Sequence, residues 1–434
     1  MTARQRLALA LYSAGWWLAV PLAAAYLLWR SLAQREYRRH WGERFLGRGP
    51  APAPGRPLIW VHAVSVGETR AAQPLIEQLA RELPAASFLL THMTPTGRAV
   101  GESIVARLPG RVTQRYLPYD LPCAAACFLR RARPSIGVVM ETEIWPNLMR
   151  STQRAGVPML LANARLSEKS AARGRRWPAL LRPAAAGFSR VAAQSEADGA
   201  RIAAWYQGPI DVTGNLKFDL EPDAGLVSAG RALRTSWGVR PVCLAASTRE
   251  GEEALLLAAL GRVRGKLDSD PVFVIVPRHP QRFDEVARLI EAEGYDCLRR
   301  SRGQWQSPPS KDALLLGDTM GEMALYYAAA DVALIGGSLR DFGGQNLIEA
   351  CAVGTPVVLG PSTFNFAQAA ADALAAGAAV RVGDADEALA AMASVCQATE
   401  RLEAMRAEAH RFAAAHRGAT ARIAGIVRAL LANG

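Results

Sequence analysis

The sequence predicts an α/β protein built from two doubly wound domains with mainly parallel sheets. A chain of 434 residues exceeds what one hydrophobic core usually holds, so two domains are expected. Short apolar runs rich in β-branched residues alternate with segments of helical period from residue 58 onward. One irregular stretch, residues 214–235, interrupts this alternation. The two series on either side of it indicate the two domains.

The strands are expected to be short and buried on both faces, as in parallel sheets covered by helices. The expected strands of the first domain are Leu58–Val64, Ser87–His92, Val112–Leu117, Ile136–Met140, Met159–Ala162, Val191–Ala193 and Asp211–Thr213. Those of the second are Val242–Ala246, Val272–Val276, Ala313–Leu316, Val332–Ile335, Pro356–Leu359 and Ala379–Val382. A long helical pattern over Glu400–Leu431 closes the second series.

The N-terminal segment has the composition of a membrane anchor. Leu7–Trp29 contains no charged residue, and as a helix it would be about 34 Å long, enough for a hydrocarbon core of about 30 Å. A cleaved signal peptide is the competing interpretation, but Tyr26–Trp29 leads directly into Arg30 without a small-residue cleavage site. The arginines after the segment outnumber Arg4 and Arg6 before it, so the body of the protein is expected in the cytoplasm.

These patterns predict four parts of the chain. Residues 1–49 form the membrane anchor with a basic interfacial segment, and residues 50–213 form the N-terminal domain. Residues 214–235 form the linker, and residues 236–434 form the C-terminal domain. Ligands of doubly wound sheets bind at the carboxyl ends of the strands, so two such domains facing each other place a ligand in the cleft between them.

Charge and cysteine usage narrow the function classes. The formal net charge is +12, and most of the excess lies in two stretches, Arg30–Arg56 and Lys169–Arg190. Such stretches suit anionic lipid headgroups, a phosphorylated substrate or nucleic acid. The anchor and the lack of aromatic-basic repeats argue against nucleic acid.

The six cysteines form no CxxC pair or zinc-type cluster, which indicates reduced thiols and no metal. Asp268–Asp270 and Asp384–Asp386 resemble metal-binding DxD motifs, but neither follows a strand, so solvated charge explains them better.

Three charged residues of the first series and the following crossing are candidates for catalysis. Glu68 opens the helical pattern after the first strand, where it either favours the helix dipole or acts on a ligand. Glu141 follows the strand Ile136–Met140 directly. If the two carboxylates lie close together, their repulsion raises one pKa and creates a general base. Lys217 lies at the crossing between the domains, where its positive charge could stabilise the negative charge that develops on a phosphate group during a reaction.

The second series offers turns suited to a nucleotide. Arg278 and His279 end the strand Val272–Val276. Gly317–Glu322 and Gly336–Glu349 are glycine-containing turns before helices, whose backbone N–H groups can hold a phosphate. There is no Walker motif and no GxGxxG. Glu349 downstream of the paired glycines is suited to ribose hydroxyls.

Ten motifs follow one another along the chain: HAVSVGETRAA, THMTPTGR, YLPYDLP, METEIWPN, ANARLSEKS, GNLKFD, VPRHPQRF, GDTMGE, GGSLRDFGGQNLIEA and GPSTFNF. Together they closely resemble the motif series of the bacterial 3-deoxy-D-manno-octulosonic acid (Kdo) transferases, which add Kdo to the lipid A precursor. The resemblance covers the whole chain, including the anchor. One departure is Gln345, where family members often carry His, so the imidazole is not essential at that position.

The resemblance implies a GT-B glycosyltransferase that transfers Kdo from CMP-Kdo to the lipid A precursor with inversion, in lipopolysaccharide biosynthesis. It implies no metal and no cofactor besides the CMP-Kdo donor. It also implies attachment to the cytoplasmic face of the inner membrane, in contact with its lipids. Glu68 would be the base, supported by Glu141 and Lys217. The residues implied to hold CMP are Pro277, Arg278, Met320, Gly321, Glu322, Asn346, Leu347, Ile348 and Glu349.

Two alternatives belong to other function classes. One is a different membrane-bound GT-B enzyme that uses a UDP-sugar, which competition between nucleotides would distinguish. The other is a tethered nucleotide-binding module without catalysis, which would bind CMP without turnover.

Overall fold

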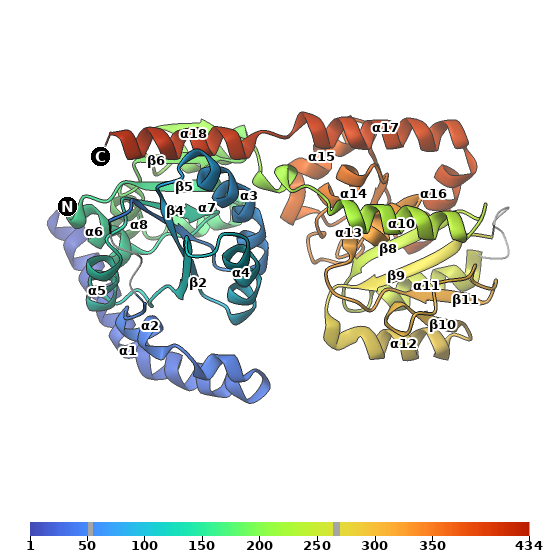
Figure 1. Ribbon diagram of the computed structural model, residues 1–434, viewed down its shortest axis with the longest axis horizontal. Helices are drawn as coiled ribbons and strands as arrows, with labels where there is room; N and C mark the ends of the chain where they lie inside the picture. Colours follow the sequence, from blue (N-terminus) through green and yellow to red (C-terminus); the bar gives the residue numbers. More distant parts are fainter. Residues whose placement is uncertain (51–54, 264–269, 434) are drawn as a thin grey trace. The chain divides into compact units, whose positions relative to one another are not determined.

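The chain folds into two compact α/β units, each built on a parallel sheet of seven strands (Figure 1). The structure is a computed structural model that describes residues 1–50, 55–263 and 270–433. Unit 1 comprises Met1–Asp219 together with Arg417–Gly434, and unit 2 comprises Leu220–His416. The α/β class with two doubly wound sheets is therefore confirmed.

Unit 1 has the strand order β3-β2-β1-β4-β5-β6-β7. Its strands are β1 (Leu58–His62), β2 (Ser87–His92), β3 (Val112–Tyr116), β4 (Ile136–Met140), β5 (Met159–Ala164), β6 (Arg190–Ala193) and β7 (Ile210–Val212). Its covering helices are α3 (Val66–Glu82), α4 (Pro95–Arg107), α5 (Pro122–Ala132), α6 (Pro146–Ala155), α7 (Glu168–Gly174), α8 (Pro178–Ala185) and α9 (Glu196–Ala203). The order reverses between β1 and β4, which makes that pair the topological switch point.

Unit 2 has the order β10-β11-β9-β8-β12-β13-β14, with its switch point between β8 and β12. Its strands are β8 (Val242–Thr248), β9 (Val272–Pro277), β10 (Asp296–Arg299), β11 (Ala313–Leu316), β12 (Val332–Ile335), β13 (Val357–Leu359) and β14 (Ala379–Arg381). Its helices are α10 (Ala224–Ser236), α11 (Glu252–Val263), α12 (Phe283–Ala292), α13 (Met323–Ala329), α14 (Ile348–Val353), α15 (Ala367–Ala375), α16 (Ala385–Gln397) and α17 (Thr399–Ala415).

The thirteen strands expected from the sequence are all present, with ends that differ by at most two residues. The one strand missed is β10, at the edge of the second sheet. It carries Asp296 and Arg299 at its ends and is half exposed, so it lacks the apolar run that marks the buried strands.

The N-terminal helix α1 (Ala3–Ala33) is long and apolar enough to cross a membrane by length and composition. Pro21 lies inside it without ending it. The short elements η1 (Arg35–Arg38) and α2 (Trp41–Leu46) follow, separated where His40 adopts a left-handed backbone with φ of 61°. Within unit 1, Leu27 and Ser31 of α1 are almost fully buried. The C-terminal end of α1 packs on η1, and its N-terminal half contacts α6 and α8 of the domain.

The chain's last helix differs from the expected domain assignment. The sequence pattern places residues 417–434 in the C-terminal domain, but the structure assigns them to unit 1. The long helical pattern is broken at Gly418, with φ of 98°, into α17 and α18 (Ala419–Ala432). Helix α18 lies beside α3 (Figure 1), and its Ile423 and Val427 are fully buried in the core that contains Leu75. An apolar helix face joins whichever core it can fill, and sequence periodicity does not say which.

The predicted linker at residues 214–235 is also divided between the units. Its first part, through η2 (Leu216–Asp219), belongs to unit 1, where the Asp219 carboxylate accepts hydrogen bonds from the backbone N–H groups of Gly418 and Thr420 at 2.6 and 2.5 Å. Its last part is α10, which packs on α13 in unit 2. The chain changes units at residues 219–220, and again at residues 416–417.

Because α18 fills the core of unit 1, emptying its buried face should destabilise that unit. We expect Ile423→Ala and Val427→Ala each to lower the free energy of unfolding by about 1–5 kcal/mol, since each leaves a cavity. Urea denaturation of the full chain measures this. Arg428→Ala on the exposed face of the same helix is the control and should change stability by less than about 1 kcal/mol. Equal effects of buried and exposed substitutions would contradict the assignment of α18 to this core.

Candidate functional site

The switch point of unit 1 brings two of the predicted catalytic residues together. Strand β1 pairs in parallel with β4, so the chain segments that follow them leave the same edge of the sheet. Glu68 lies in the first turn of α3, after β1, and Glu141 directly follows β4. Glu143 follows Glu141 by two residues, so three carboxylates lie at this edge.

Glu68 takes part in the local structure of the helix start. Ser65 caps α3, and its hydroxyl accepts a hydrogen bond from the backbone N–H of Glu68 at 3.4 Å. The carboxylate of Glu68 in turn accepts from the backbone N–H of Val64 at 2.8 Å and from the Ser65 hydroxyl at 3.0 Å. This reciprocal pattern resembles a capping box, so the helix start fixes the position of the carboxylate.

The environment of Glu68 also changes its acidity. Burial, and next to it the negative charge of Glu141, raises the pKa of Glu68 to about 7, although the hydrogen bonds from Val64 and Ser65 favour the charged form. A smaller contribution in the same direction comes from Glu143. A carboxylate with this pKa is ionised in about half of the molecules at neutral pH and accepts a proton far more readily than an ordinary glutamate.

Glu141 forms an ion pair with Lys217, which lies in η2 after the last strand of unit 1. The Nζ of Lys217 lies 3.3 Å from Oε1 of Glu141, and both side chains are largely buried. Glu141 has a left-handed backbone, with φ of 59°, a conformation that is uncommon for residues other than glycine and often marks functional sites. The structure thus brings Glu141 and Lys217 into contact and places Glu68 within electrostatic reach of Glu141.

Two residues of this edge are absent from the predicted site. Asn163 in β5 accepts a hydrogen bond from the backbone N–H of Leu216 at 3.0 Å and so fixes the turn that carries Lys217. Its φ of 54° is a conformation in which asparagine is enriched, but a strand pattern does not reveal it. Burial raises the pKa of Glu143, and Glu141 adds to this. Glu143 could have been predicted from the sequence, because it lies in the same motif as Glu141, directly after the same strand.

The buried histidines beside this edge are neutral at pH 7. Burial lowers the pKa of His62 to about 3 and that of His92 to about 4. The Nδ1 of His62 hydrogen-bonds the Thr91 hydroxyl at 2.9 Å, and His92 contacts the Thr69 hydroxyl of α3. Neither imidazole supplies positive charge near Glu68, and both contribute to packing below the first turn of α3.

In unit 2, Arg278 follows β9 at the carboxyl edge of the sheet. Its backbone N–H donates to the carbonyl of Thr248 at 3.0 Å, and its exposed side chain donates from Nε to Oε1 of Gln345 at 3.2 Å. Pro277 before it is buried. Gln345 therefore positions the guanidinium of Arg278. His279 is partly buried, and burial together with the neighbouring arginines lowers its pKa.

The turn after β11 carries the next predicted group, Met320, Gly321 and Glu322. Met320 is 59% exposed, and Gly321 has φ of 85°, a conformation that glycine adopts without strain. Arg300 donates two hydrogen bonds to the Glu322 carboxylate, at 3.1 and 3.3 Å. Burial acts to raise the pKa of Glu322, but the hydrogen bonds from Arg300 and from Thr319 outweigh it, so the pKa is lowered and the group stays charged. Arg300 was not predicted, because the pattern around it is that of a polar loop.

The turn after β12 holds Asn346 through Glu349 at the start of α14. The Asn346 side chain donates to Oε1 of Glu349 at 3.0 Å and accepts from the backbone N–H of Ile348 at 3.1 Å. The side chains of Leu347 and Ile348 are each only 1% exposed. A ligand at this turn could therefore meet the backbone of these two residues but not their side chains.

The aspartates of the DxD-like patterns take part in local structure. Asp384 caps α16, and Asp386 forms an ion pair with Arg262. Asp270 pairs with Arg240, while Asp268 lies outside the described residues. Among the residues that the structure describes, no group of three or more His, Cys, Asp or Glu side chains could hold a metal ion.

Two doubly wound domains in series are the arrangement of the GT-B fold. A solved glycosyltransferase from Rickettsia africae shares this fold, with a TM-score of 0.58 and 12% identity over 88% of this chain and all of that chain. Residues 39–220 match the 3-deoxy-D-manno-octulosonic-acid transferase (kdotransferase) family.

Relatives named 3-deoxy-D-manno-octulosonic acid transferase extend this match over most of the chain. The one from Bordetella pertussis is 48% identical over 86% of this chain and 87% of its own length. The one from Haemophilus influenzae is 38% identical over 80% of each chain. The chain therefore belongs to the 3-deoxy-D-manno-octulosonic acid transferase family, which confirms the resemblance, and it is a glycosyltransferase.

The carboxylate cluster generates a prediction about acidity. Glu141→Gln removes a neighbouring negative charge and leaves the cation of Lys217 in place, so the pKa of Glu68 should fall toward its ordinary value. NMR titration of ¹³C-labelled glutamate side chains measures this pKa. Glu77→Gln, on the same helix and outside the cluster, should leave the Glu68 titration unchanged. An unchanged or higher pKa of Glu68 in the Glu141 variant would disprove the coupling.

Proposed function

We propose that this protein transfers Kdo from CMP-Kdo to the lipid A precursor, with inversion at the anomeric carbon, in lipopolysaccharide biosynthesis. Family membership supports the sugar that is transferred. The observation that carries the mechanism is the buried carboxylate of Glu68, with its pKa raised to about 7. Such a group is matched to removing a proton from an acceptor hydroxyl at neutral pH.

Inversion in one displacement needs a single base on the side of the sugar opposite the leaving group, as in inverting glycoside chemistry. In this proposal Glu68 accepts the proton of the acceptor hydroxyl while the bond to CMP breaks. The hydrogen bonds from Val64 and Ser65 hold the carboxylate in one orientation, so little reorganisation is needed. Glu141 and Lys217 form the charged pair beside it and stabilise the transition state, with Glu141 also keeping Glu68 basic.

The nucleotide is assigned to unit 2. Arg278 and the helix start at Asn346–Glu349 both follow strands at the carboxyl edge of one sheet, and a cation beside a helix start suits a phosphate leaving group. Glu349 is suited to the ribose hydroxyls, and the turn at Met320–Glu322 borders the same edge. With leaving-group charge neutralised in this way, the proposed reaction requires neither a metal nor a cofactor.

The proposed location is the cytoplasmic face of the inner membrane, with α1 as the single anchor. The length and apolar composition of α1 support attachment, and the arginines that follow it support a cytoplasmic domain. An acceptor with acyl chains and phosphates is found at such a surface, so the anchor would bring Glu68 to the layer where the hydroxyl lies.

The role of Glu68 is tested by removing its basicity without changing its size. Glu68→Gln should lower turnover by roughly 10² or more, while CMP affinity stays near normal. Gln keeps an acceptor oxygen for the N–H of Val64, so the helix start should persist. Product formation from CMP-Kdo and lipid A precursor, followed by mass spectrometry, gives the rate. Glu102→Gln, an exposed change on α4, is the matched control, and equal rates in both variants would refute the proposal.

The nucleotide site is tested by binding alone. Arg278→Ala and Glu349→Ala should each weaken CMP binding by about 1–3 kcal/mol, because each removes a charge-assisted contact. Calorimetry with CMP, and with UDP as competitor, measures the affinity and its base preference. Arg288→Ala and Glu291→Ala on the exposed face of α12 serve as controls of the same charge. Unchanged CMP affinity in both site variants would show that the nucleotide binds elsewhere.

A further inference from the structure

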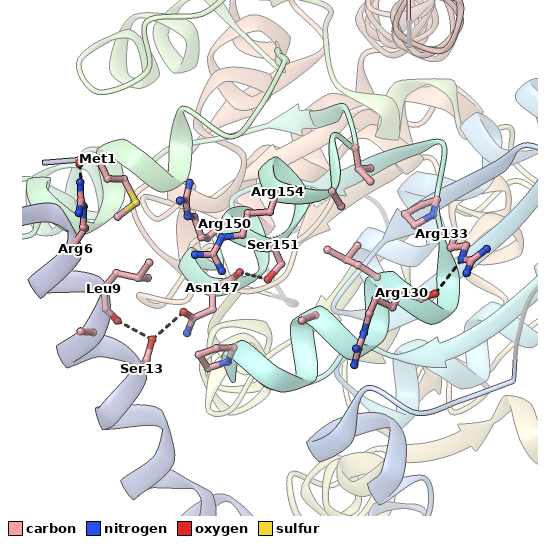
Figure 2. Close-up of a pocket in the computed structure, with 17 residues that line it drawn as sticks. Met1, Arg6, Leu9, Ser13, Arg130, Arg133, Asn147, Arg150, Ser151 and Arg154 are labelled. Atoms are coloured by element: carbon pink, nitrogen blue, oxygen red, sulfur yellow. Dashed lines mark hydrogen bonds between the residues drawn. The ribbon is translucent and has the colours of Figure 1, made fainter.

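A groove of about 940 Å³ lies in unit 1 between α1, α5 and α6, away from the residues discussed so far (Figure 2). Its walls include five arginines, which we call the groove arginines. They are Arg6 on α1, Arg130 and Arg133 at the end of α5, and Arg150 and Arg154 on α6. None of the described residues that line the groove is acidic. Three helices thus bring five cations to one hollow.

The groove arginines have no carboxylate partners in the part of the chain that the structure describes. Arg6 donates from Nε to the carbonyl of Met1, and Arg133 donates from Nε to the carbonyl of Arg130, both at 3.4 Å. Arg300, in contrast, forms an ion pair with Glu322. Cations in the last turn of a helix favour its dipole, which accounts for Arg130 and Arg154 singly. It does not account for Arg6, or for the convergence of all five.

The polar groups of the groove floor, in contrast, are satisfied by the protein. The Ser13 hydroxyl lies 2.9 Å from Oδ1 of Asn147 and 2.7 Å from the carbonyl of Leu9. Asn147 is buried and also donates to the carbonyl of Asp120, and the Ser151 hydroxyl donates to the carbonyl of Asn147 (Figure 2). The groove therefore offers an incoming molecule mainly guanidinium donors, which are suited to phosphate oxygens.

Helix α1 connects the groove to a lipid surface. Its Arg6, Leu9 and Ser13 face the groove, whereas Leu7, Leu11, Leu18 and Leu22 are 61–79% exposed. Successive residues of a helix are about 100° apart, so this leucine stripe lies on the side of α1 roughly opposite the groove face. Trp16 stacks on Tyr119, with ring centroids 5.7 Å apart, which holds α1 against the domain. If the stripe enters the bilayer with α1 lying in the interface, the opposite side of the helix, and the groove beside it, lies at the level of the headgroups.

Three of the groove arginines and the carboxylate cluster lie toward opposite edges of the sheet of unit 1. In a doubly wound sheet each helix starts at the carboxyl edge and ends at the amino edge. Arg130, Arg133 and Arg154 are at the ends of α5 and α6, so they lie toward the amino edge. Glu68 and Glu141 are at the carboxyl edge. A phosphate held by these three arginines would therefore lie toward the opposite edge of the sheet from the carboxylates, which favours a lipid of the surrounding membrane over the acceptor as its source.

We propose that this groove binds the phosphate of an anionic phospholipid headgroup from the bilayer, seating the domain on the membrane beside α1. The site is independent of which sugar the enzyme transfers. It gives the anchor a fixed orientation, because α1 alone supplies apolar attachment and the groove arginines add a charged contact on one side only. The preference is for anionic over zwitterionic lipid, and it weakens as salt screens the phosphate.

The test compares a triple variant, Arg130→Gln, Arg133→Gln and Arg154→Gln, with the wild-type full chain. All three side chains are exposed, so folding should be retained, and thermal unfolding checks this. Flotation with vesicles of phosphatidylcholine, and of equal parts phosphatidylcholine and phosphatidylglycerol, gives the preference for anionic lipid. The control variant Arg81→Gln, Arg288→Gln and Arg401→Gln removes the same charge from exposed positions outside the groove.

The groove variant should lose at least about tenfold of the anionic preference, since each arginine near an anionic surface contributes a factor of about five. The control variant should keep most of the preference. In neutral detergent the KM for the lipid acceptor should stay unchanged in the groove variant. Equal losses in both variants would reduce the effect to net charge and overturn the proposal. A raised KM would assign the groove to the acceptor and would also overturn the proposal. If inorganic phosphate at constant ionic strength abolished the preference for anionic lipid, the groove would be a site for free phosphate, and the proposal would again be wrong.

Discussion

Parallel pairing of β1 with β4 is the constraint on which the site of unit 1 depends. The two strands are far apart in sequence, and they become neighbours because the sheet order reverses at that point. Glu68 and Glu141 leave the same edge as a result, and the low dielectric of a half-buried edge makes their repulsion effective. Lys217 reaches the same place from the end of the series, held by the turn that Asn163 fixes.

The structural and the chemical interpretations of Glu68 are compatible. As a helix-start residue, its carboxylate is bound by one backbone N–H and one hydroxyl, which favour ionisation. Burial and Glu141 oppose this and prevail, so the pKa is raised. A capping residue with an ordinary pKa would be a poor base at neutral pH, and a free carboxylate would be poorly oriented. The combination provides a fixed acceptor for a proton.

In unit 2 a carboxylate at the sheet edge is kept ionised, whereas in unit 1 the pKa of Glu68 is raised. Glu322 is kept ionised by Arg300 and Thr319, and Asn346 orients Glu349 at the start of α14. Arg278 is oriented by Gln345, whose amide oxygen accepts a hydrogen bond from its Nε and does not titrate.

Much of the fold is readable locally. Buried parallel strands are continuous apolar runs, so all but the polar edge strand β10 follow from the sequence, as do the apolar α1 and the positions of Glu68, Glu141 and Arg278 just after strands. The residue pattern also indicates the turns after strands as candidate sites, although glycines and carboxylates there also have structural roles, as the capping contacts of Glu68 and Asp384 show.

What the tertiary structure alone decided are relations between distant segments. Strand order brought Glu68 to Glu141, a left-handed Asn163 secured the Lys217 turn, and α18 returned to the core of unit 1 instead of continuing unit 2. The groove arginines likewise come from three helices and show no motif in the sequence. Periodicity reports which face of an element is buried, but the partner of that face is set by packing between segments that local sequence does not relate.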